Sequence, residues 1–290
     1  MELPSAVRRR ILAFQRQEIT EYHIYRNIAK TIRDPENRRI LEQIADDERR
    51  HAEDWKKYTG VESVPDRWAV AKYSLLSRLL GFTFAIKLME SGEEQAQRNY
   101  EELRPSVPEI DSWIRDEDSH EHKLLEMLDE ERLHYVGSVV LGLNDALVEL
   151  TGALAGYTLA LQNTKLIALT GLITGIAAAL SMAASEYLST RAEKTAKHPV
   201  RAAVYTGIAY ILTVALLITP YLVFDNYFLD LAIALLSAVL VIAAFNYYIS
   251  VAKGESFRAR FLEMAGLSLA VAGFSFLIGF LIREFLGIDV

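Results

Sequence analysis

The second half of the chain contains five long apolar stretches, and these constrain the fold more than any other feature of the sequence. Each stretch is long enough for a helix to cross the hydrocarbon core of a bilayer, which takes roughly 20 apolar residues. Because only short polar joints separate them, lipid is the environment that can cover all five at once. The predicted spans are Val136–Leu161, Leu166–Leu188, Ala202–Phe224, Leu229–Val251 and Phe261–Ile282.

Charge is distributed unevenly along the chain. Met1–Arg132 carry 50 charged residues among 132, whereas Leu133–Val290 carry 19 among 158. We therefore expect a soluble domain over residues 1–132 and a membrane domain over residues 133–290, both built of helices. The fold class predicted for the whole chain is all-α.

The composition excludes several classes of protein. The chain has no cysteine, so disulfide scaffolds, iron–sulfur clusters, thiolate zinc sites and catalytic thiols are ruled out. The formal net charge is -7, and no long basic stretch is present, so we expect no nucleic-acid partner.

The cations in the joints between spans predict the orientation in the membrane, because Lys and Arg gather on the cytoplasmic side. They are concentrated in the joints after the second and fourth spans, as Arg191, Lys194, Lys197, Arg201, Lys253, Arg258 and Arg260. This pattern predicts a multi-pass protein of the plasma or inner membrane. Its amino-terminal domain would be cytoplasmic and its carboxyl terminus would lie outside.

The first two spans contain acidic residues that lipid alone would not favour. Asp145 and Glu149 are four residues apart and share a helical face, as do Met182 and Glu186. A charge in the hydrocarbon region costs at least about 2.5–3.5 kcal/mol, so these carboxylates need a use. Carboxylate oxygens with one thioether suit iron(II) or manganese(II), and a carboxylate can take up a proton when the cation leaves. The alternative, strongest for Glu186, is an acid near the interface that serves packing or topology.

The same two spans resemble the vacuolar iron transporter family. The resemblance is carried by Gly142–Asp145, Leu154–Gly156 and, more specifically, the Ser-Met-x-x-x-Glu-Tyr pattern within Ala179–Ser189. It implies a homodimeric, five-span, proton-coupled carrier of iron(II) and manganese(II). By this similarity Asp145 and Met182 would lie on the translocation path and Glu186 near its cytoplasmic mouth. The family's glutamate-rich insert between spans two and three has no counterpart here, since only Ser189–Arg201 joins them.

The soluble half reads as four helices. Long stretches rich in Glu, Arg, Leu and Ala are interrupted at Asp34-Pro35, Gly60–Asp66 and Pro105/Pro108. The expected helices are Ser5–Ile32, Pro35–Tyr58, Trp68–Leu103 and Glu109–Arg132. Four helices with joints of these lengths predict a bundle whose interior can host a metal site.

Each of these helices supplies one element of a dimetal motif. Two helices carry Glu-x-x-His, the first as Glu48/His51 and the second as Glu117/His120, and this spacing puts both side chains on one face. The other two helices contribute Glu18 and Glu93. Four carboxylates balance the four positive charges of two divalent ions, and two imidazoles complete the coordination. Additional candidate ligands, which can equally be surface acids, are Glu21, Glu90 and Glu94; Tyr25 and Tyr100 fit core positions better than ligand positions.

This half resembles the rubrerythrin branch of the ferritin-like superfamily, through both Glu-x-x-His motifs and the segment Gly92–Tyr100. The resemblance implies a non-haem di-iron centre, with manganese as an alternative metal, held by Glu18, Glu48, His51, Glu93, Glu117 and His120. Rubrerythrins also carry a four-cysteine domain that delivers electrons, which a chain without cysteine lacks. The two resemblances, in this order on one chain, match the membrane-bound ferritin family.

Together these features predict a carrier that exports iron(II), manganese(II) or both from the cytoplasm, with a di-iron domain that captures or senses the metal. The rival hypothesis is a membrane-anchored ferroxidase or peroxidase of the rubrerythrin type. Five spans with buried acids are more than an anchor requires, which favours the carrier. A bundle that only dimerises would not need six aligned ligands.

Overall fold

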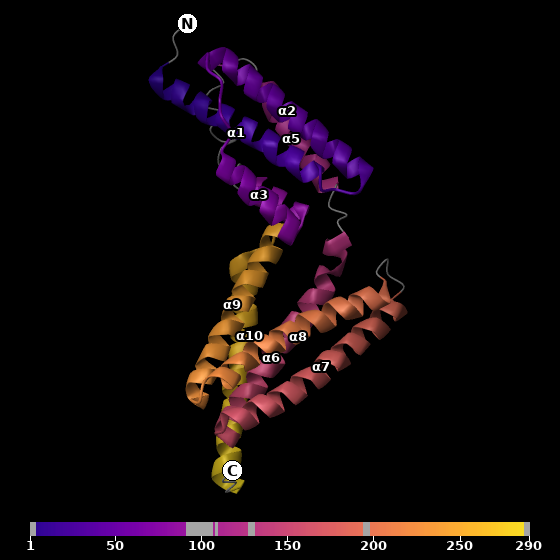
Figure 1. The fold of residues 1–290 in the computed structure, drawn as a ribbon, viewed down its shortest axis with the longest axis vertical. Coiled ribbons are helices and arrows are strands. Elements are labelled where there is room, and N and C mark those ends of the chain that lie inside the picture. Colours follow the sequence, from indigo (N-terminus) through magenta and orange to yellow (C-terminus); the bar gives the residue numbers. More distant parts are fainter. Residues whose placement is uncertain (1–3, 91–106, 108–109, 127–130, 194–197, 287–290) are drawn as a thin grey trace. The chain divides into compact units, whose positions relative to one another are not determined.

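The computed structural model describes residues 4–90, 107, 110–126, 131–193 and 198–286. Its regular elements within these residues are helices, with no strand among them, so the all-α prediction is confirmed. The chain divides into two compact units, Met1–Glu130 and Glu131–Val290, and we describe each by itself. Figure 1 shows the course of the helices.

The first unit is built from α1 (Ser5–Ala29), α2 (Pro35–Thr59), α3 (Arg67–Leu80) and α5 (Ile110–Glu126), and residues 82–90 are also helical. Local signals set the helix ends. The Asp34 side chain accepts a hydrogen bond from the Asn37 amide and Pro35 fills the first turn of α2, where a missing amide hydrogen costs nothing. At the other end of α2, Gly60 takes a left-handed conformation with φ 70°.

The long helix predicted over Trp68–Leu103 is wrong as a single element. It stops at Leu80, because Gly81 adopts φ 97° and ψ 152°, a backbone conformation that L side chains rarely reach. A new helical stretch begins at residue 82. The remainder of the predicted helix, residues 91–103, falls outside the described residues.

The described part of the bundle core comprises two apolar clusters. One contains Ile24 and Ile44 and the other contains Ile11 and Trp55, all fully or almost fully buried. Between the two clusters, each of α1, α2 and α5 carries buried polar side chains, among them Glu18, Glu48 and His120. The bundle therefore contains a buried polar layer between two hydrophobic ones.

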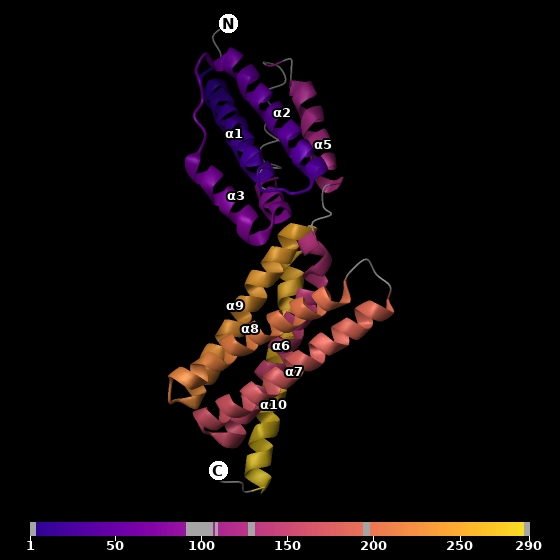
Figure 2. The same ribbon diagram turned by 45° about the vertical axis from the view of Figure 1, so that its right-hand side comes forward.

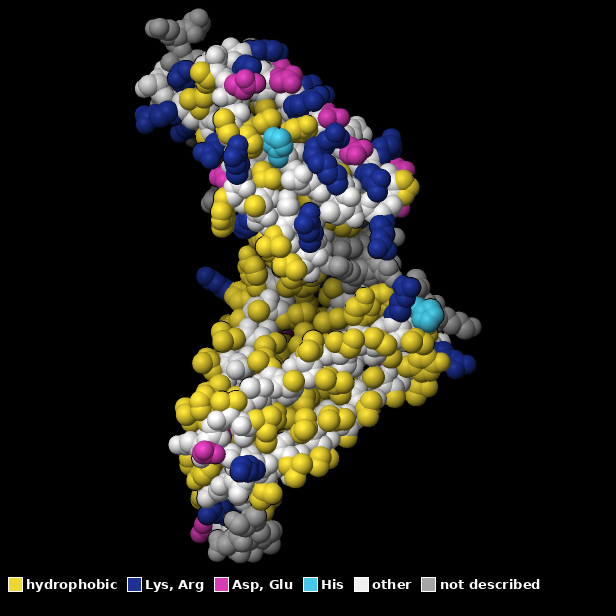
Figure 3. All heavy atoms as spheres, in the orientation of Figure 1, with side chains coloured by type: hydrophobic (Ala, Val, Ile, Leu, Met, Phe, Trp, Pro, Cys, Tyr) yellow, Lys and Arg dark blue, Asp and Glu magenta, His cyan; other side chains and the backbone are white. Residues whose placement is uncertain are grey.

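Within its described residues, the second unit contains five helices long and apolar enough to cross a membrane. They are α6 (Glu131–Leu161), α7 (Thr164–Ala192), α8 (Pro199–Val223), α9 (Tyr227–Lys253) and α10 (Phe257–Leu286). Helix α6 packs against all four others, and α7 and α8 form an antiparallel hairpin (Figure 2). In Figure 3 the visible face of this unit is mostly hydrophobic, whereas most of the visible Lys, Arg, Asp and Glu side chains lie on the first unit. Such a surface suits a lipid environment.

Glycines allow the membrane helices to approach closely. A Cβ at Gly142 of α6 would lie 2.4 Å from the carbonyl oxygen of Thr206 on α8. A Cβ at Gly279 of α10 would lie 2.4 Å from the carbonyl oxygen of Gly156 on α6. Small residues at such crossings are typical of helices that associate through van der Waals packing in lipid.

The substitution Gly279→Ala should therefore destabilise the membrane unit by about 1–3 kcal/mol, the usual cost of overpacking. Thermal unfolding of the full-length protein in detergent, followed by circular dichroism, measures the effect. Gly273→Ala on the same helix is the matched control, because nothing lies within 4 Å of a Cβ there. Equal midpoints for the two variants would contradict the close approach of α6 and α10.

Candidate metal centre

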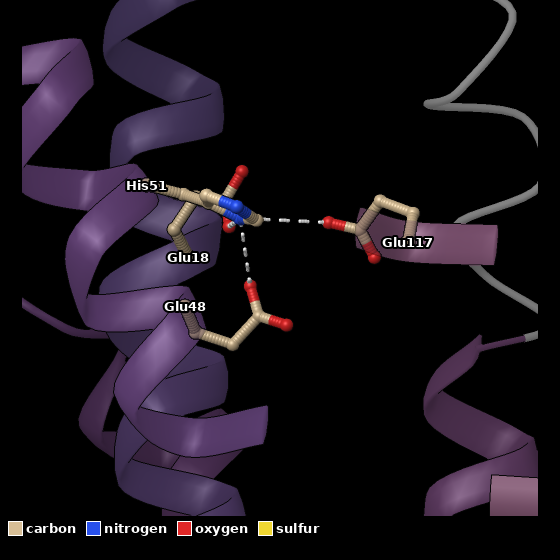
Figure 4. Close-up of side chains that lie close together, drawn as sticks. All are labelled: Glu18, Glu48, His51 and Glu117. Carbon is tan, nitrogen blue, oxygen red and sulfur yellow. Dashed lines mark ion pairs between the residues drawn. The ribbon is translucent and has the colours of Figure 1, made fainter. Parts of the chain in front are cut away.

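Four of the predicted ligands meet in the polar layer of the bundle. Glu18 from α1, Glu48 and His51 from α2, and Glu117 from α5 each offer one ligand atom, and these atoms all lie within 4.8 Å of one another. Glu18, Glu48 and His51 are buried, and Glu117 is half-buried. Figure 4 shows the four side chains pointing toward one another from three helices.

The second histidine, His120, lies beside the same group of side chains. The two imidazoles define two positions, each facing both Glu48 and Glu117. Nδ1 of His51 lies 3.8 Å from an oxygen of Glu48 and 3.8 Å from an oxygen of Glu117. Nδ1 of His120 lies 3.2 Å and 3.9 Å from the other oxygens of the same two carboxylates. Glu48 and Glu117 thus each reach toward both imidazoles, whose ring centres are 6.2 Å apart. Two carboxylates shared between two imidazole-bearing positions are the arrangement of a carboxylate-bridged dimetal site.

An aspartate precedes each Glu-x-x-His motif, and the two aspartates bind the histidines crosswise. Asp116 on α5 lies 3.1 Å from Nε2 of His51 on α2. Asp47 on α2 lies 3.1 Å from Nε2 of His120 on α5. A carboxylate at Nε2 keeps the proton on that nitrogen and leaves Nδ1, which faces the glutamates, as the ligand atom.

Glu18 is oriented by the indole of Trp55, whose Nε1 donates to Oε1 at 3.3 Å. Trp55 in turn packs against Trp113, with ring centres 4.3 Å apart. The apolar cluster that contains these two tryptophans therefore fixes one carboxylate of the site.

The pKa values of the cluster indicate that its buried carboxylates would be stabilised by nearby positive charge. Burial raises the pKa of Glu48 well above its ordinary value, and the negative charges of Glu117 and Glu18 add to this effect. Burial would lower the pKa of His51, but the nearby negative charge of Glu18, with help from Asp116, raises that pKa to about 9. The pKa of His120 is likewise raised, because Glu117 and Asp47 outweigh burial. Without a cation, protons must supply the charge that balances these carboxylates.

The residues present fit a pair of first-row divalent metals. Oε2 of Glu48 and the Nδ1 atoms of His51 and His120 are buried and make no hydrogen bond among the described residues. Buried polar atoms usually have such a partner, and all three are good ligand atoms for iron(II). The donor set, carboxylate oxygens with two imidazole nitrogens, matches that expected of a non-haem di-iron centre.

The remaining predicted residues of the bundle have different outcomes. Glu93, Glu94 and Tyr100 lie outside the described residues. Glu90 accepts a hydrogen bond of 2.5 Å from the Tyr25 hydroxyl, and Tyr25 is buried as the sequence led us to expect. Sequence reasoning missed Asp47 and Asp116, although an Asp directly before the Glu of each motif was a visible signal.

The predicted transport residues lie on the first two membrane helices. Asp145, Met182 and Glu186 are half-buried and Glu149 is exposed within this unit. Two of them have hydrogen-bond partners on neighbouring helices: the Tyr210 hydroxyl donates to Glu149 at 2.9 Å, and the Ser138 hydroxyl donates to Glu186 at 2.5 Å.

Comparison with known families supports both halves of this description. The rubrerythrin family model matches residues 13–135, and the VIT family model matches residues 136–198. The chain therefore consists of a ferritin-like domain of the rubrerythrin type fused to a membrane domain of the VIT type. These matches indicate a di-iron site in the first and membrane metal transport in the second. Neither the curated proteins nor the solved structures gave a significant match.

Replacement of Asp116 by Ala should weaken metal binding by about 10- to 100-fold, the usual cost of removing a group that orients a ligating histidine. Anaerobic titration of the full-length protein with iron(II) measures the affinity. Asp46→Ala is the control, since Asp46 is exposed and adjacent to the motif. An unchanged affinity in the Asp116 variant would show that the crossed pairs do not position the histidines.

Replacement of Glu48 by Gln should stabilise the metal-free bundle while removing its response to metal. The raised pKa of Glu48 means that its ionisation opposes folding, a penalty absent below pH 4.5 and increasing above it. Gln keeps the shape of the side chain without the charge. Each tenfold decrease in the acid dissociation constant of Glu48 on folding costs about 1.4 kcal/mol of stability, and Gln avoids this cost. Tryptophan fluorescence reports thermal unfolding of this unit alone, because all three tryptophans, Trp55, Trp68 and Trp113, lie in it. A lower midpoint for metal-free Glu48→Gln at pH 7 would contradict the electrostatic argument.

Proposed function

We propose that the protein exports iron(II) from the cytoplasm, with manganese(II) as an alternative cargo, and that its soluble domain captures the metal at a di-iron centre. The observation that carries the proposal is the buried cluster of carboxylates and imidazoles on α1, α2 and α5, present on one chain with acidic membrane helices of the VIT type. We place the soluble domain at residues 1–132 and the membrane domain at residues 133–290. The compact units divide two residues earlier, after Glu130.

In the proposed di-metal centre the ligands have three roles. Glu48 and Glu117 would be shared by the two metal ions, because each lies near both imidazoles. Glu18 and His51 would help to hold one ion and His120 the other; by resemblance Glu93, which lies outside the described residues, would be a further ligand. When bound, the metal pair supplies one-electron redox chemistry. Asp47 and Asp116 hold the protons on Nε2 of the two histidines, so that Nδ1 remains available.

The cargo ion would follow the acidic faces of α6 and α7. Glu186, held by Ser138, lies nearest the basic joint between α7 and α8 and would receive the ion from the cytoplasm. Met182 and Asp145 would follow, and Glu149, held by Tyr210, would complete the path. A carboxylate that releases its cation can take up a proton, which supports coupling to an inward proton flux.

The proposed membrane orientation and the proposed direction of transport both rest on the basic residues in the joints between the membrane helices. Arg191 and Arg201 flank the joint between α7 and α8, and Lys253 and Arg258 flank the one between α9 and α10. By the positive-inside rule these joints face the cytoplasm of a plasma or inner membrane, as does the domain that precedes α6. A metal-capturing domain on the cytoplasmic side supports export over uptake.

A homodimer is part of the proposal. Glu149 is exposed on α6 and Asp145 is only half-buried. Such carboxylates are costly against lipid. A second copy placed against this face would cover them and enclose a path between two identical helices.

A second candidate function is oxidation of iron(II) at the di-iron centre, favoured by two histidines that the crossed aspartates already orient. Oxygen consumption on adding iron(II) to the full-length protein, compared with the Glu48→Gln variant, tests this activity. Oxidation would coexist with transport by serving regulation or storage, but its ferric product would be a poor cargo for a path made for divalent ions.

Transport in vesicles of known sidedness tests the main proposal. Inside-out vesicles expose the cytoplasmic face, and they should accumulate iron(II) when their lumen is acidic. Manganese(II) offered in the same assay decides the second cargo. Accumulation of iron in intact cells that express the protein would overturn export.

The variant Asp145→Ala should abolish transport in these vesicles while metal binding by the bundle stays at the wild-type level. The carboxylate lost is one that α6 would contribute to the path, and it belongs to a different compact unit from the di-iron ligands. Asp225→Ala, an exposed acid in the joint between α8 and α9, is the control that should transport normally. Wild-type rates from the Asp145 variant would refute the assigned path.

A further inference from the structure

Helix α3 of the soluble unit differs in charge from the unit that contains it. Met1–Arg132 contain 22 basic and 28 acidic residues, yet every charge within Arg67–Leu80 is positive: Arg67, Lys72 and Arg78. The acid just before the helix, Asp66, caps the amides of Trp68 and Ala69 and pairs with Arg16. The helix therefore presents a basic surface on an acidic domain.

One face of α3 belongs to the bundle core. Val70, Tyr73 and Leu76 are partly buried and pack against the apolar cluster that contains Ile28 and Ile44. Through this face the helix packs onto the bundle.

The opposite face carries large apolar side chains in solvent. Trp68 is 74% exposed, Leu75 56% and Leu79 66%. At about 100° per residue, these three positions fall within a sector of about 40°. Exposed apolar patches of this kind mark sites of interaction with a protein or a membrane.

The cations flank this apolar strip on both sides. On the same helical projection Arg67 and Arg78 lie at one edge and Lys72 at the other. The Lys72 ammonium lies 5.8 Å from the centre of the Trp68 ring, so charge and aromatic face are held together. An apolar strip with Trp and Leu between two basic edges is the arrangement of helices that lie in a membrane interface.

We propose that α3 lies on the cytoplasmic leaflet of the bilayer that the second unit spans. Trp68, Leu75 and Leu79 would enter the boundary between headgroups and acyl chains, and Arg67, Lys72 and Arg78 would contact the phosphates of anionic lipids. The soluble unit and the membrane helices belong to one chain, so a bilayer is a partner that the protein carries with it. This surface does not depend on whether the second unit transports metal.

Charge favours lipid over a second copy as the occupant of this face. Two copies meeting through α3 would bring three cations against three like cations, which opposes association. Anionic lipid surfaces attract such residues, by about fivefold in partitioning for each Lys or Arg near the surface. The docked helix would hold the di-iron bundle at the membrane surface.

The tryptophans provide a direct test on the full-length protein in nanodiscs. Trp55 and Trp113 are 0% and 4% exposed, so quenchers should reach mainly Trp68. The discs contain phosphatidylglycerol and phosphatidylcholine with bromine on the acyl chains close to the headgroup. The emission of Trp68 is the difference between the wild-type protein and the variant Trp68→Phe. We expect the brominated lipids to quench most of this emission and aqueous iodide to quench little of it.

Charge variants separate lipid docking from simple proximity. Arg67→Glu with Arg78→Glu should lower the docked population by fivefold or more and restore access of iodide to Trp68. Discs of phosphatidylcholine alone should have the same effect on the wild-type protein. Arg9→Glu, an exposed cation on α1, is the matched control and should leave quenching unchanged. Fluorescence melting confirms that each variant is folded.

Two results would overturn the proposal. In the first, brominated lipid does not quench Trp68 and iodide quenches it as strongly as in detergent. In the second, Trp68 is shielded from both quenchers to an extent that increases with protein concentration, which would assign the face to a second copy.

Discussion

The structure depends on carboxylate groups that are buried away from water. In the bundle, Glu18, Glu48 and Glu117 converge on a volume in which an uncompensated carboxylate would be expensive. Two apolar clusters on either side of this layer keep water out and thereby strengthen every charge interaction within it. The same constraint acts in the second unit, where the medium is lipid. The metal ions that we propose would replace the solvent that these carboxylates lose.

The sequence predicted the architecture because both of its main signals are local. Hydrophobic length identifies a membrane helix without any knowledge of its neighbours, and the joints that separate such helices are short. The spacing Glu-x-x-His similarly fixes which side chains share a face. The fold brings together the two predicted pairs, Glu48 with His51 and Glu117 with His120. This proximity follows from that spacing and from the predicted four-helix topology.

What could not be predicted depends on tertiary contacts or on a single backbone conformation. Apolar residues lie on both sides of Gly81, and an isolated glycine is tolerated within many helices, so the sequence did not mark Gly81 as a break. The crossed pairs of Asp47 with His120 and Asp116 with His51 connect helices more than sixty residues apart in the chain. Such a pairing becomes visible only when both helices are in place.

This crossing has a consequence for biosynthesis. Helices α1 and α2 leave the ribosome first and already carry Glu18, Glu48 and His51, half of a strong chelator. Until Asp116 arrives on α5, however, nothing fixes the tautomer of His51, and Asp47 has no imidazole to hold. The hairpin of α1 and α2 would therefore bind iron only weakly during synthesis. The full proposed site would form only when α5 has docked.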